Sequence, residues 1–173
     1  MDHDAYSDDY IRAVLASVRT IAMVGASDNW NRPSYFAMKY LQKKGFRVIP
    51  VNPRVSSAEI LGEEVVKELR DLAPPVDMVD IFRNSEAAGP IADEAIALAK
   101  EKGFKVVWMQ LGVRNDEAAA RAEKSGLAVV MNRCPKIEYA RLNGELSWNG
   151  FNSNVISSKR RRLPPARAKG TMP

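Results

Sequence analysis

The stretch Ile21-Ala22-Met23-Val24-Gly25-Ala26-Ser27 is an apolar run that ends in a glycine-containing turn. A segment with helical spacing follows at 33–44, and a second apolar run, Arg47 to Val51, ends in Asn52-Pro53-Arg54. A strand, a turn, a helix and a second strand form the first βαβ unit of a parallel sheet. This stretch therefore predicts an α/β fold.

The same alternation of apolar strands and helices continues to residue 142. Strands are predicted at 20–25, 46–51, 77–82, 105–111 and 127–131, helices at 8–19, 33–44, 86–102, 115–125 and 137–142, and a short helix at 64–71 after a loop at 54–62. The strands are short, apolar and non-alternating, which is typical of strands covered on both faces. We predict a single domain with a Rossmann-like, doubly wound, parallel five-stranded sheet in three α/β/α layers, with strand order 3-2-1-4-5.

Size and charge set the domain organisation. The chain has 173 residues, 46% of them apolar, which suits one ordinary domain. The net charge of +5 comes from the C-terminal end, because six basic residues and no acidic residue follow position 146. We predict a domain at 1–146 and a basic, flexible tail at 147–173. The near-neutral domain does not imply nucleic-acid binding, and the tail is either a solubilising end or an arm for an acidic partner.

Other features suggest where the protein works and which chemistry it lacks. The acidic start Met1-Asp2-His3-Asp4 and the absence of a long apolar run predict a cytoplasmic protein without a membrane span. The single cysteine, Cys134, suits a reducing compartment. His3, the only histidine, is expected in a mobile N-terminal end, so we expect no histidine triad, no phosphohistidine and no metal cluster in the fold.

The first strand end has the features of a phosphate-binding turn. In doubly wound sheets, ligands bind beyond the carboxyl ends of the strands. Gly25 lets the backbone approach a phosphate, and Arg32 and Ser34 lie at the start of the next helix, where free N–H groups attract anions. Asn31 or Ser34 is expected to cap that helix. The alternative is a tight turn without a ligand, because the second and third glycines of G-x-G-x-x-G are absent.

The second strand end carries Asn52, Pro53 and Arg54, where a dinucleotide dehydrogenase would have an acid. An arginine there suits a ligand with an extra phosphate on its ribose. Coenzyme A and NADP have this phosphate, whereas NAD does not. The alternative is a strand-ending turn with an exposed arginine.

The third strand ends in Phe82 and Arg83. Phe82 is a candidate for stacking near an adenine, and Arg83 for contacting a phosphate. Alternatively, Arg83 forms an ion pair with Glu86, and Ser85 caps the following helix.

The last two strand ends carry Gln110, Gly112 and Cys134. Gly112 would let a ligand pass close to the backbone. The Cys134 thiol is either inert or placed to meet a ligand thiol, which would permit a mixed disulfide or an acyl transfer.

Taken together, these motifs resemble the stand-alone coenzyme A-binding domain proteins, which are similar to the N-terminal domain of the succinyl-CoA synthetase α subunit. The resemblance covers residues 8–142 and rests on six segments in the right order: 24–27, 32–34, 48–53, 79–83, 107–112 and 132–138. The second domain and phosphorylated histidine of the synthetase have no counterpart, so its chemistry does not carry over.

The resemblance implies a site for coenzyme A across the strand ends. It assigns the pyrophosphate to Gly25, Ala26, Ser27, Arg32 and Ser34, the adenosine 3′-phosphate end to Asn52, Pro53 and Arg54, the adenine side to Phe82 and Arg83, and the pantetheine arm to Gln110, Gly112 and Cys134.

Three functions remain open at this point. The first is a coenzyme A- or acyl-CoA-binding protein without chemistry of its own, either monomeric or oligomeric. The second is an enzyme, either an NADP-linked oxidoreductase or an acyl-transfer protein that uses Cys134. The third is a sensor whose tail contacts a partner.

Overall fold

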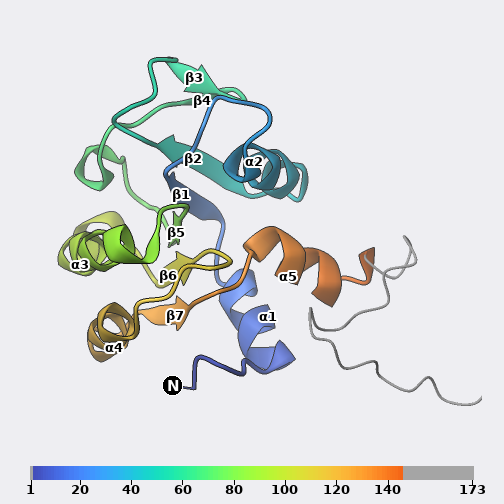
Figure 1. The fold of residues 1–173 in the computed structure, drawn as a ribbon, viewed down its shortest axis with the longest axis vertical. Coiled ribbons are helices and arrows are strands. Elements are labelled where there is room, and N and C mark those ends of the chain that lie inside the picture. Colours follow the sequence, from blue (N-terminus) through green and yellow to red (C-terminus); the bar gives the residue numbers. More distant parts are fainter. Residues whose placement is uncertain (1, 146–173) are drawn as a thin grey trace, which may run out of the picture.

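A parallel five-stranded sheet forms the centre of the computed structural model, which describes residues 2–145 (Figure 1). Its strands are β1 (Thr20–Val24), β2 (Arg47–Val51), β5 (Met78–Ile81), β6 (Val106–Met109) and β7 (Ala128–Val130). All of their pairings are parallel. The predicted three-layer, doubly wound α/β fold is therefore confirmed.

The strand order differs from the prediction. The sheet runs β2-β1-β5-β6-β7, which is 2-1-3-4-5 when only its own strands are numbered, so 3-2-1-4-5 is wrong. The carboxylate of Asp77 gives a physical reason. It accepts the N–H groups of Arg19 and Thr20 at 2.8 and 3.0 Å and the Lys105 ammonium at 2.7 Å. These bonds tie the starts of β1, β5 and β6 together, and the switch point of the sheet falls between β1 and β5.

The segment between β2 and β5 contains a hairpin instead of the predicted loop and short helix. The strands β3 (Glu59–Ile60) and β4 (Glu63–Glu64) pair antiparallel, and only a 3₁₀ turn, η1 (Leu69–Asp71), follows. Leu61 and Gly62 connect the two strands with φ of 50° and 81°, the pattern of a type I′ turn. A leucine rarely adopts a positive φ, so the sequence did not indicate this hairpin.

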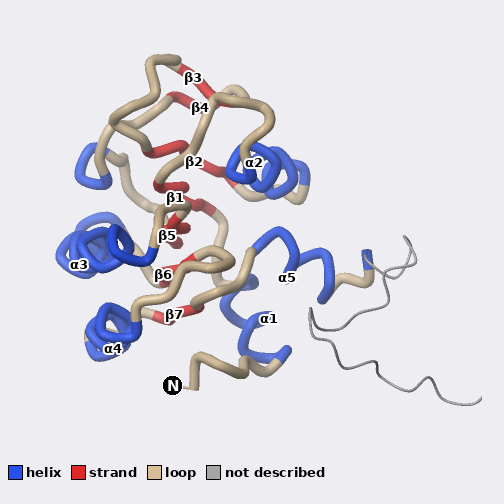
Figure 2. The backbone as a smooth tube through the Cα atoms, viewed as in Figure 1, coloured by secondary structure: helices blue, strands red, loops and turns tan. Residues whose placement is uncertain are grey.

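Helices cover both faces of the sheet (Figure 2), and five of those in the described residues are α-helices. One face carries α1 (Asp8–Ala16), α2 (Pro33–Lys43) and α5 (Pro135–Leu142), and the other carries α3 (Ser85–Lys102) and α4 (Asp116–Lys124). Each face encloses its own apolar core. None of the helices in residues 2–145 combines the length and apolar character needed to cross a bilayer. The predicted basic tail, 147–173, lies outside the described residues.

Three local predictions are wrong. The N-cap of α2 is Arg32 without a side-chain hydrogen bond, so neither Asn31 nor Ser34 caps this helix. The N-cap of α3 is Asn84, whose side chain accepts the N–H of Ala87 at 3.0 Å, so Ser85 is not the cap. His3 is not in a loose end, because its Nδ1 lies 2.8 Å from the Tyr6 hydroxyl, which also accepts the N–H of Met131.

Candidate functional site

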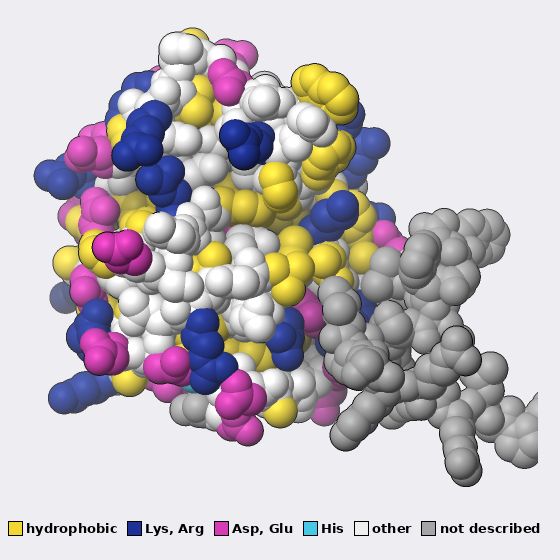
Figure 3. Space-filling view, viewed as in Figure 1, with side chains coloured by type: hydrophobic (Ala, Val, Ile, Leu, Met, Phe, Trp, Pro, Cys, Tyr) yellow, Lys and Arg dark blue, Asp and Glu magenta, His cyan; other side chains and the backbone are white. Residues whose placement is uncertain are grey.

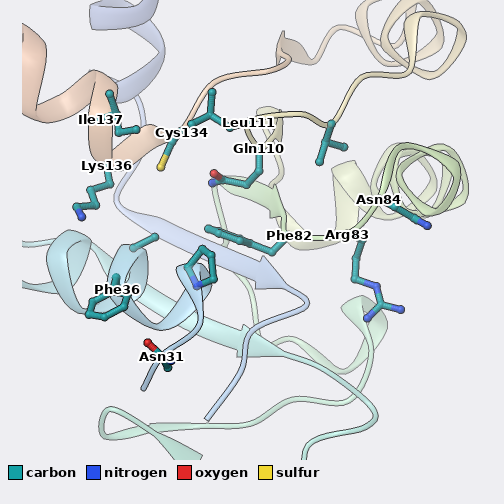
Figure 4. Close-up of a pocket in the computed structure, with 13 residues that line it drawn as sticks. Asn31, Phe36, Phe82, Arg83, Asn84, Gln110, Leu111, Cys134, Lys136 and Ile137 are labelled. Carbon is teal, nitrogen blue, oxygen red and sulfur yellow. The ribbon is translucent and has the colours of Figure 1, made fainter. Parts of the chain in front are cut away.

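Two pockets lie along the carboxyl edge of the sheet, on either side of the loop that follows β5. We call the first the α3 pocket, a hollow of about 420 Å³ lined by the ends of β1 and β2, residues 67–70 and the first turns of α3. The second, the α5 pocket, has a volume of about 880 Å³ and lies between the N-termini of α2 and α5 and the ends of β5 and β6 (Figure 4). Arg83 lines both pockets, which makes them neighbours.

Gly25 allows the strand ends to come together at the switch point. Its N–H donates to the Val51 carbonyl at 2.8 Å, and its φ is +88°. A Cβ atom at this position would lie 2.5 Å from the Phe82 carbonyl oxygen and 2.8 Å from Cδ of Arg83. The glycine therefore permits a close approach between the β1 turn and the end of β5, in addition to any approach of a phosphate.

Asn52 holds two loops of the α3 pocket together. Its Nδ2 donates to the Ala26 carbonyl at 2.7 Å, and its Oδ1 accepts the N–H of Arg54 at 2.9 Å. The first bond joins the turn after β1 to the turn after β2, and the second forms a local Asx turn. The side chain of Asn52 thereby fixes the backbone from which Arg54 extends.

Basic groups dominate the α3 pocket, where four basic residues face two acidic ones: Arg54, Lys67, Arg70 and Arg83 against Glu68 and Glu94. Dark blue side chains gather over the region between the β3–β4 hairpin and α3 (Figure 3).

Two of these four cations have partners, because Lys67 donates to the Val55 carbonyl at 2.7 Å and Arg70 pairs with Glu68 at 2.8 Å. Among residues 2–145, neither Arg54 nor Arg83 has an acidic partner, and the predicted alternative of an Arg83–Glu86 ion pair is not formed. Their guanidinium groups are therefore available for an anion.

Apolar side chains form most of the lining of the α5 pocket, together with the cations Arg83 and Lys136. Phe36 from α2, Leu111 after β6 and Ile137 from α5 border it in Figure 4. Phe36 and Leu111 are 46% and 47% exposed, which is unusual for large apolar side chains. Hydrophobic side chains gather over the same region, between α2 and α5, in Figure 3. This pocket suits the uncharged part of a ligand.

A buried polar pair lies beside the α5 pocket. Asp80, in the middle of β5, is completely buried, and Gln110 donates from Nε2 to its two carboxylate oxygens at 2.8 and 3.1 Å. Burial raises the pKa of Asp80 to about 7, although the hydrogen bond from Gln110 acts in the opposite direction. The carboxyl group therefore changes its charge near neutral pH.

Cys134 points into the α5 pocket from the start of α5, and the Gln110 carboxamide faces it (Figure 4). Burial raises the pKa of its thiol to about 11, which outweighs the opposing effect of the N–H groups of Ile137 and Lys136. The nearby Asp80 carboxylate raises the pKa further. At neutral pH the thiol keeps its proton, so it is a weak nucleophile in this state.

The structure brings together most of the residues that the sequence predicted for the site. Those that line the α3 pocket are Gly25, Asn52, Pro53, Arg54 and Arg83, and those that line the α5 pocket are Phe82, Arg83, Gln110 and Cys134. Five others line neither pocket: Ala26 and Ser34, which are buried, and Ser27, Arg32 and Gly112. The amide of Gly112 is already bonded to Oδ1 of Asn132 at 2.8 Å.

Sequence reasoning missed Lys67, Phe36 and Asp80. Lys67 reaches the α3 pocket because Val66 forms a parallel bridge to Val51, which no local pattern indicates. Asp80 did leave a signal, because a lone carboxylate in an apolar strand requires a specific environment. No group of three His, Cys, Asp or Glu side chains that could hold a metal ion occurs in the described part of the chain.

Comparisons with known proteins agree with this geometry. Residues 19–140 match the model of the family described as CoA binding domain. The "Uncharacterized protein YneT" of Bacillus subtilis (strain 168) is 35% identical over 130 residues, which are 75% of this chain and 92% of YneT.

Solved structures with similar folds include the following two. A "hypothetical protein" from Pyrococcus horikoshii OT3 is 37% identical with a TM-score of 0.73, over 82% of this chain and 95% of that chain. The "dinucleotide forming Acetyl-coenzyme A synthetase 1" of Ca. Korarchaeum cryptofilum, in complex with phosphate and ADP, has a TM-score of 0.57 at 22% identity, over 73% of this chain and 28% of that larger chain, and so shares the fold. The resemblance expected from the motifs is confirmed, and the chain belongs to the CoA binding domain family.

Proposed function

We propose that this protein binds coenzyme A or an acyl-CoA across the carboxyl edge of its sheet. The adenosine 3′-phosphate end would occupy the α3 pocket, and the pantetheine arm would extend into the α5 pocket. The observation that carries this proposal is that two adjoining pockets share Arg83 and differ in their linings: the α3 pocket has four basic residues, and the larger α5 pocket has exposed apolar side chains beside Arg83 and Lys136. Coenzyme A has the matching polarity, since a phosphorylated nucleotide forms one end and a long uncharged arm forms the other.

The basic end of the site accounts for the phosphates. Arg54 is exposed at the α3 pocket, and Arg83 stands where the two pockets meet. We assign the ribose 3′-phosphate to Arg54 and the pyrophosphate to Arg83. A guanidinium group forms two parallel hydrogen bonds with a phosphate, which gives both affinity and orientation.

The apolar end of the site favours binding over chemistry. The high pKa of Cys134 keeps its thiol protonated at neutral pH, which disfavours attack on a thioester. The Asp80 carboxyl group is buried beneath the pocket and already bonded to Gln110. Membership of the CoA binding domain family and the fold shared with a protein named as an acetyl-CoA synthetase support the choice of ligand.

Calorimetry and thermal unfolding with coenzyme A, acetyl-CoA, dephospho-CoA, NADP and NAD test this function. A ligand that binds only the folded state raises the melting temperature by mass action, so coenzyme A and acetyl-CoA should give the largest shifts. A larger shift with NADP would favour the oxidoreductase alternative instead, and no shift with any coenzyme A species would refute the proposal.

The variant Arg54→Ala tests the placement of the 3′-phosphate. It should lower the affinity for coenzyme A by roughly 10-fold or more and the affinity for dephospho-CoA only slightly. The reason is that a hydrogen-bonded charge pair contributes about 1.5–3 kcal/mol to binding. Arg47→Ala is the matched control, since Arg47 is an exposed arginine at the start of β2, at the opposite end of the strand from Arg54, and among residues 2–145 its acidic partner is Glu63. Equal losses for the two ligands would place the 3′-phosphate elsewhere.

A further inference from the structure

The Gln110 side chain can present either its carbonyl oxygen or its amide N–H group to the α5 pocket, and the charge of Asp80 determines which of them it presents. A carboxylate only accepts hydrogen bonds, so an ionised Asp80 requires Gln110 to turn its Nε2 inward, as the distances of 2.8 and 3.1 Å show. The Oε1 atom of the same amide then points away from Asp80. Since Gln110 lines the α5 pocket, this oxygen is the acceptor available to a ligand there.

Protonation of Asp80 reverses this arrangement. A carboxylic acid has a hydroxyl proton that must be donated when it is buried, and Asp80 is fully buried. Gln110 is its only side-chain hydrogen-bond partner among residues 2–145, so the proton is best accepted by Oε1. Rotation of the amide by a half turn places Oε1 against Asp80 and turns Nε2, a donor, toward the pocket.

We propose that Asp80 and Gln110 act as a proton-controlled selector, in which the charge of Asp80 sets whether the α5 pocket offers its ligand a carbonyl oxygen or an amide N–H. The pair determines specificity by positioning: Gln110 contacts the ligand, and Asp80 acts through Gln110. The pKa of Asp80, about 7, places the change of state in the physiological range.

The surroundings of Asp80 leave its charge to be set mainly by burial and by Gln110. Met23 on β1 and Trp108 on β6 lie beside it in register, and neither titrates. The Cys134 thiol, from the start of α5, is a titratable group whose pKa is raised by the Asp80 carboxylate. Lys136 of α5 and Arg83 after β5 line the same pocket, but no ion pair joins either of them to Asp80 within the described chain.

The consequence for the ligand rests on the proposed function, which brings the thiol end of coenzyme A into the α5 pocket. Free coenzyme A carries an S–H donor at this end, and an acyl-CoA carries a thioester carbonyl, which is an acceptor. The ionised state of Asp80 should therefore favour coenzyme A, and the protonated state should favour the acyl form. The protein would exchange one form for the other as the pH changes around neutrality.

Nuclear magnetic resonance of the full chain without ligand tests the selector independently of ligand binding. The carboxyl ¹³C signal of Asp80 should titrate with a midpoint near pH 7, and the side-chain NH₂ signals of Gln110 should shift with the same midpoint. In Asp80→Asn the Gln110 signals should no longer follow pH over this range. Gln110 signals that ignore the Asp80 titration, or an Asp80 carboxyl that stays in one state from about pH 5.5 to 8, would overturn the inference.

The ratio of the dissociation constants of acetyl-CoA and coenzyme A tests the ligand consequence. In the wild type this ratio should fall roughly fivefold from about pH 8 to pH 6, the effect of exchanging one modest hydrogen bond. Asp80→Asn should have a ratio that does not vary with pH, since its amide stays neutral. Asp93→Asn, which removes an exposed carboxylate on α3, should behave as the wild type.

The two experiments separate the selector from the proposed function. If neither ligand binds the wild type, the proposed function fails, and the resonance titration still decides whether the pair switches. If both bind and the wild type and Asp80→Asn show the same pH dependence of the ratio, the selector is refuted while coenzyme A binding stands.

Discussion

Asp80 shows how one buried residue links stability to pH. Its pKa is raised from an ordinary 3.8 to about 7, so between these values the folded protein holds a proton that the unfolded chain has released. The contribution of Asp80 to stability is then fully present below about pH 4 and is lost as the pH rises through 7. A shift of about three pKa units corresponds to roughly 4 kcal/mol at most.

Asp80→Asn should therefore remove this pH dependence. We expect urea unfolding to show a wild type that loses stability between pH 5 and pH 8, and a variant that loses much less, because the asparagine has no proton to release. Asp93→Asn, which lacks only an exposed carboxylate, should keep the pH dependence of the unfolding free energy that the wild type shows. An unchanged slope in Asp80→Asn would mean that Asp80 is ionised throughout.

Arg83 differs from Arg54 because it lines both pockets. Since we assign the pyrophosphate to Arg83, Arg83→Ala should weaken coenzyme A and dephospho-CoA by similar factors, roughly 10-fold or more. Calorimetry on Arg83→Ala and Arg54→Ala with both ligands checks this pattern. Discrimination between the ligands by Arg83→Ala would reassign the 3′-phosphate to Arg83.

The turn after β1 is the element that most restricts sequence at the site. Gly25→Ala would strain a positive φ and also force a Cβ into the Phe82 carbonyl and the Arg83 side chain. We expect a loss of about 2 kcal/mol or more, together with weaker ligand binding because Arg83 is displaced. Denaturant unfolding and calorimetry measure the two effects.

Gly45→Ala is the matched control for the turn. Gly45 follows α2 with φ of +90°, and a Cβ there would meet nothing within 4 Å. This variant should be less stable by about 1 kcal/mol, the cost of an alanine at a positive φ, and should keep its ligand affinity. Equal losses in the two variants would show that the contact with the end of β5 does not matter.

The amino edge of the sheet depends on Asp77. Although burial opposes it, the bonds from Lys105 and from the backbone of Thr20 and Arg19 lower the pKa of this carboxyl group. A lowered pKa means that stability is present above the unfolded value, near 3.8, and is lost as the pH falls through the folded value. Asp77→Asn should therefore be less stable than the wild type at pH 7 by about 1–3 kcal/mol, with the gap closing near pH 3 in urea unfolding. A gap that does not close would assign the loss to packing.

The elements also show where prediction from sequence succeeded and where it failed. The periodicity of residues 8–142 predicted all five sheet strands and all five α-helices, with ends that shifted by a few residues. It failed at the hairpin, whose turn at Leu61-Gly62 uses an unusual positive φ, and at the strand order. The order depends on where β5 inserts, and the contacts of Asp77 that accompany it are distant in sequence.

In the whole molecule, the proposed ligand would occupy the α3 pocket with one end and the α5 pocket with the other. Adenosine 3′,5′-bisphosphate should bind the α3 pocket, and pantetheine should bind the α5 pocket, each more weakly than coenzyme A, because linking two fragments removes the entropy loss of one association. Calorimetry measures the affinity of each fragment, and hydrogen exchange of the loops that line each pocket shows which pocket the fragment occupies.

Variants in the two pockets are the controls for the fragment experiment. Arg54→Ala should weaken the binding of the bisphosphate and leave the binding of pantetheine unaffected, and Phe36→Ala should do the reverse. If Phe36→Ala weakens the bisphosphate while pantetheine is unchanged, the orientation of coenzyme A is the opposite of the one proposed.

The chain order of residues was enough to identify an α/β sheet, its strand ends and the polar groups that follow them, because periodicity and turn chemistry act between near neighbours. The tertiary structure determined the position of β5 between β1 and β6 and the burial of Asp80 beside Gln110. It also determined that two pockets with different linings form along the carboxyl edge of the sheet. These features arise from contacts between residues tens of positions apart, whose energies no local pattern contains.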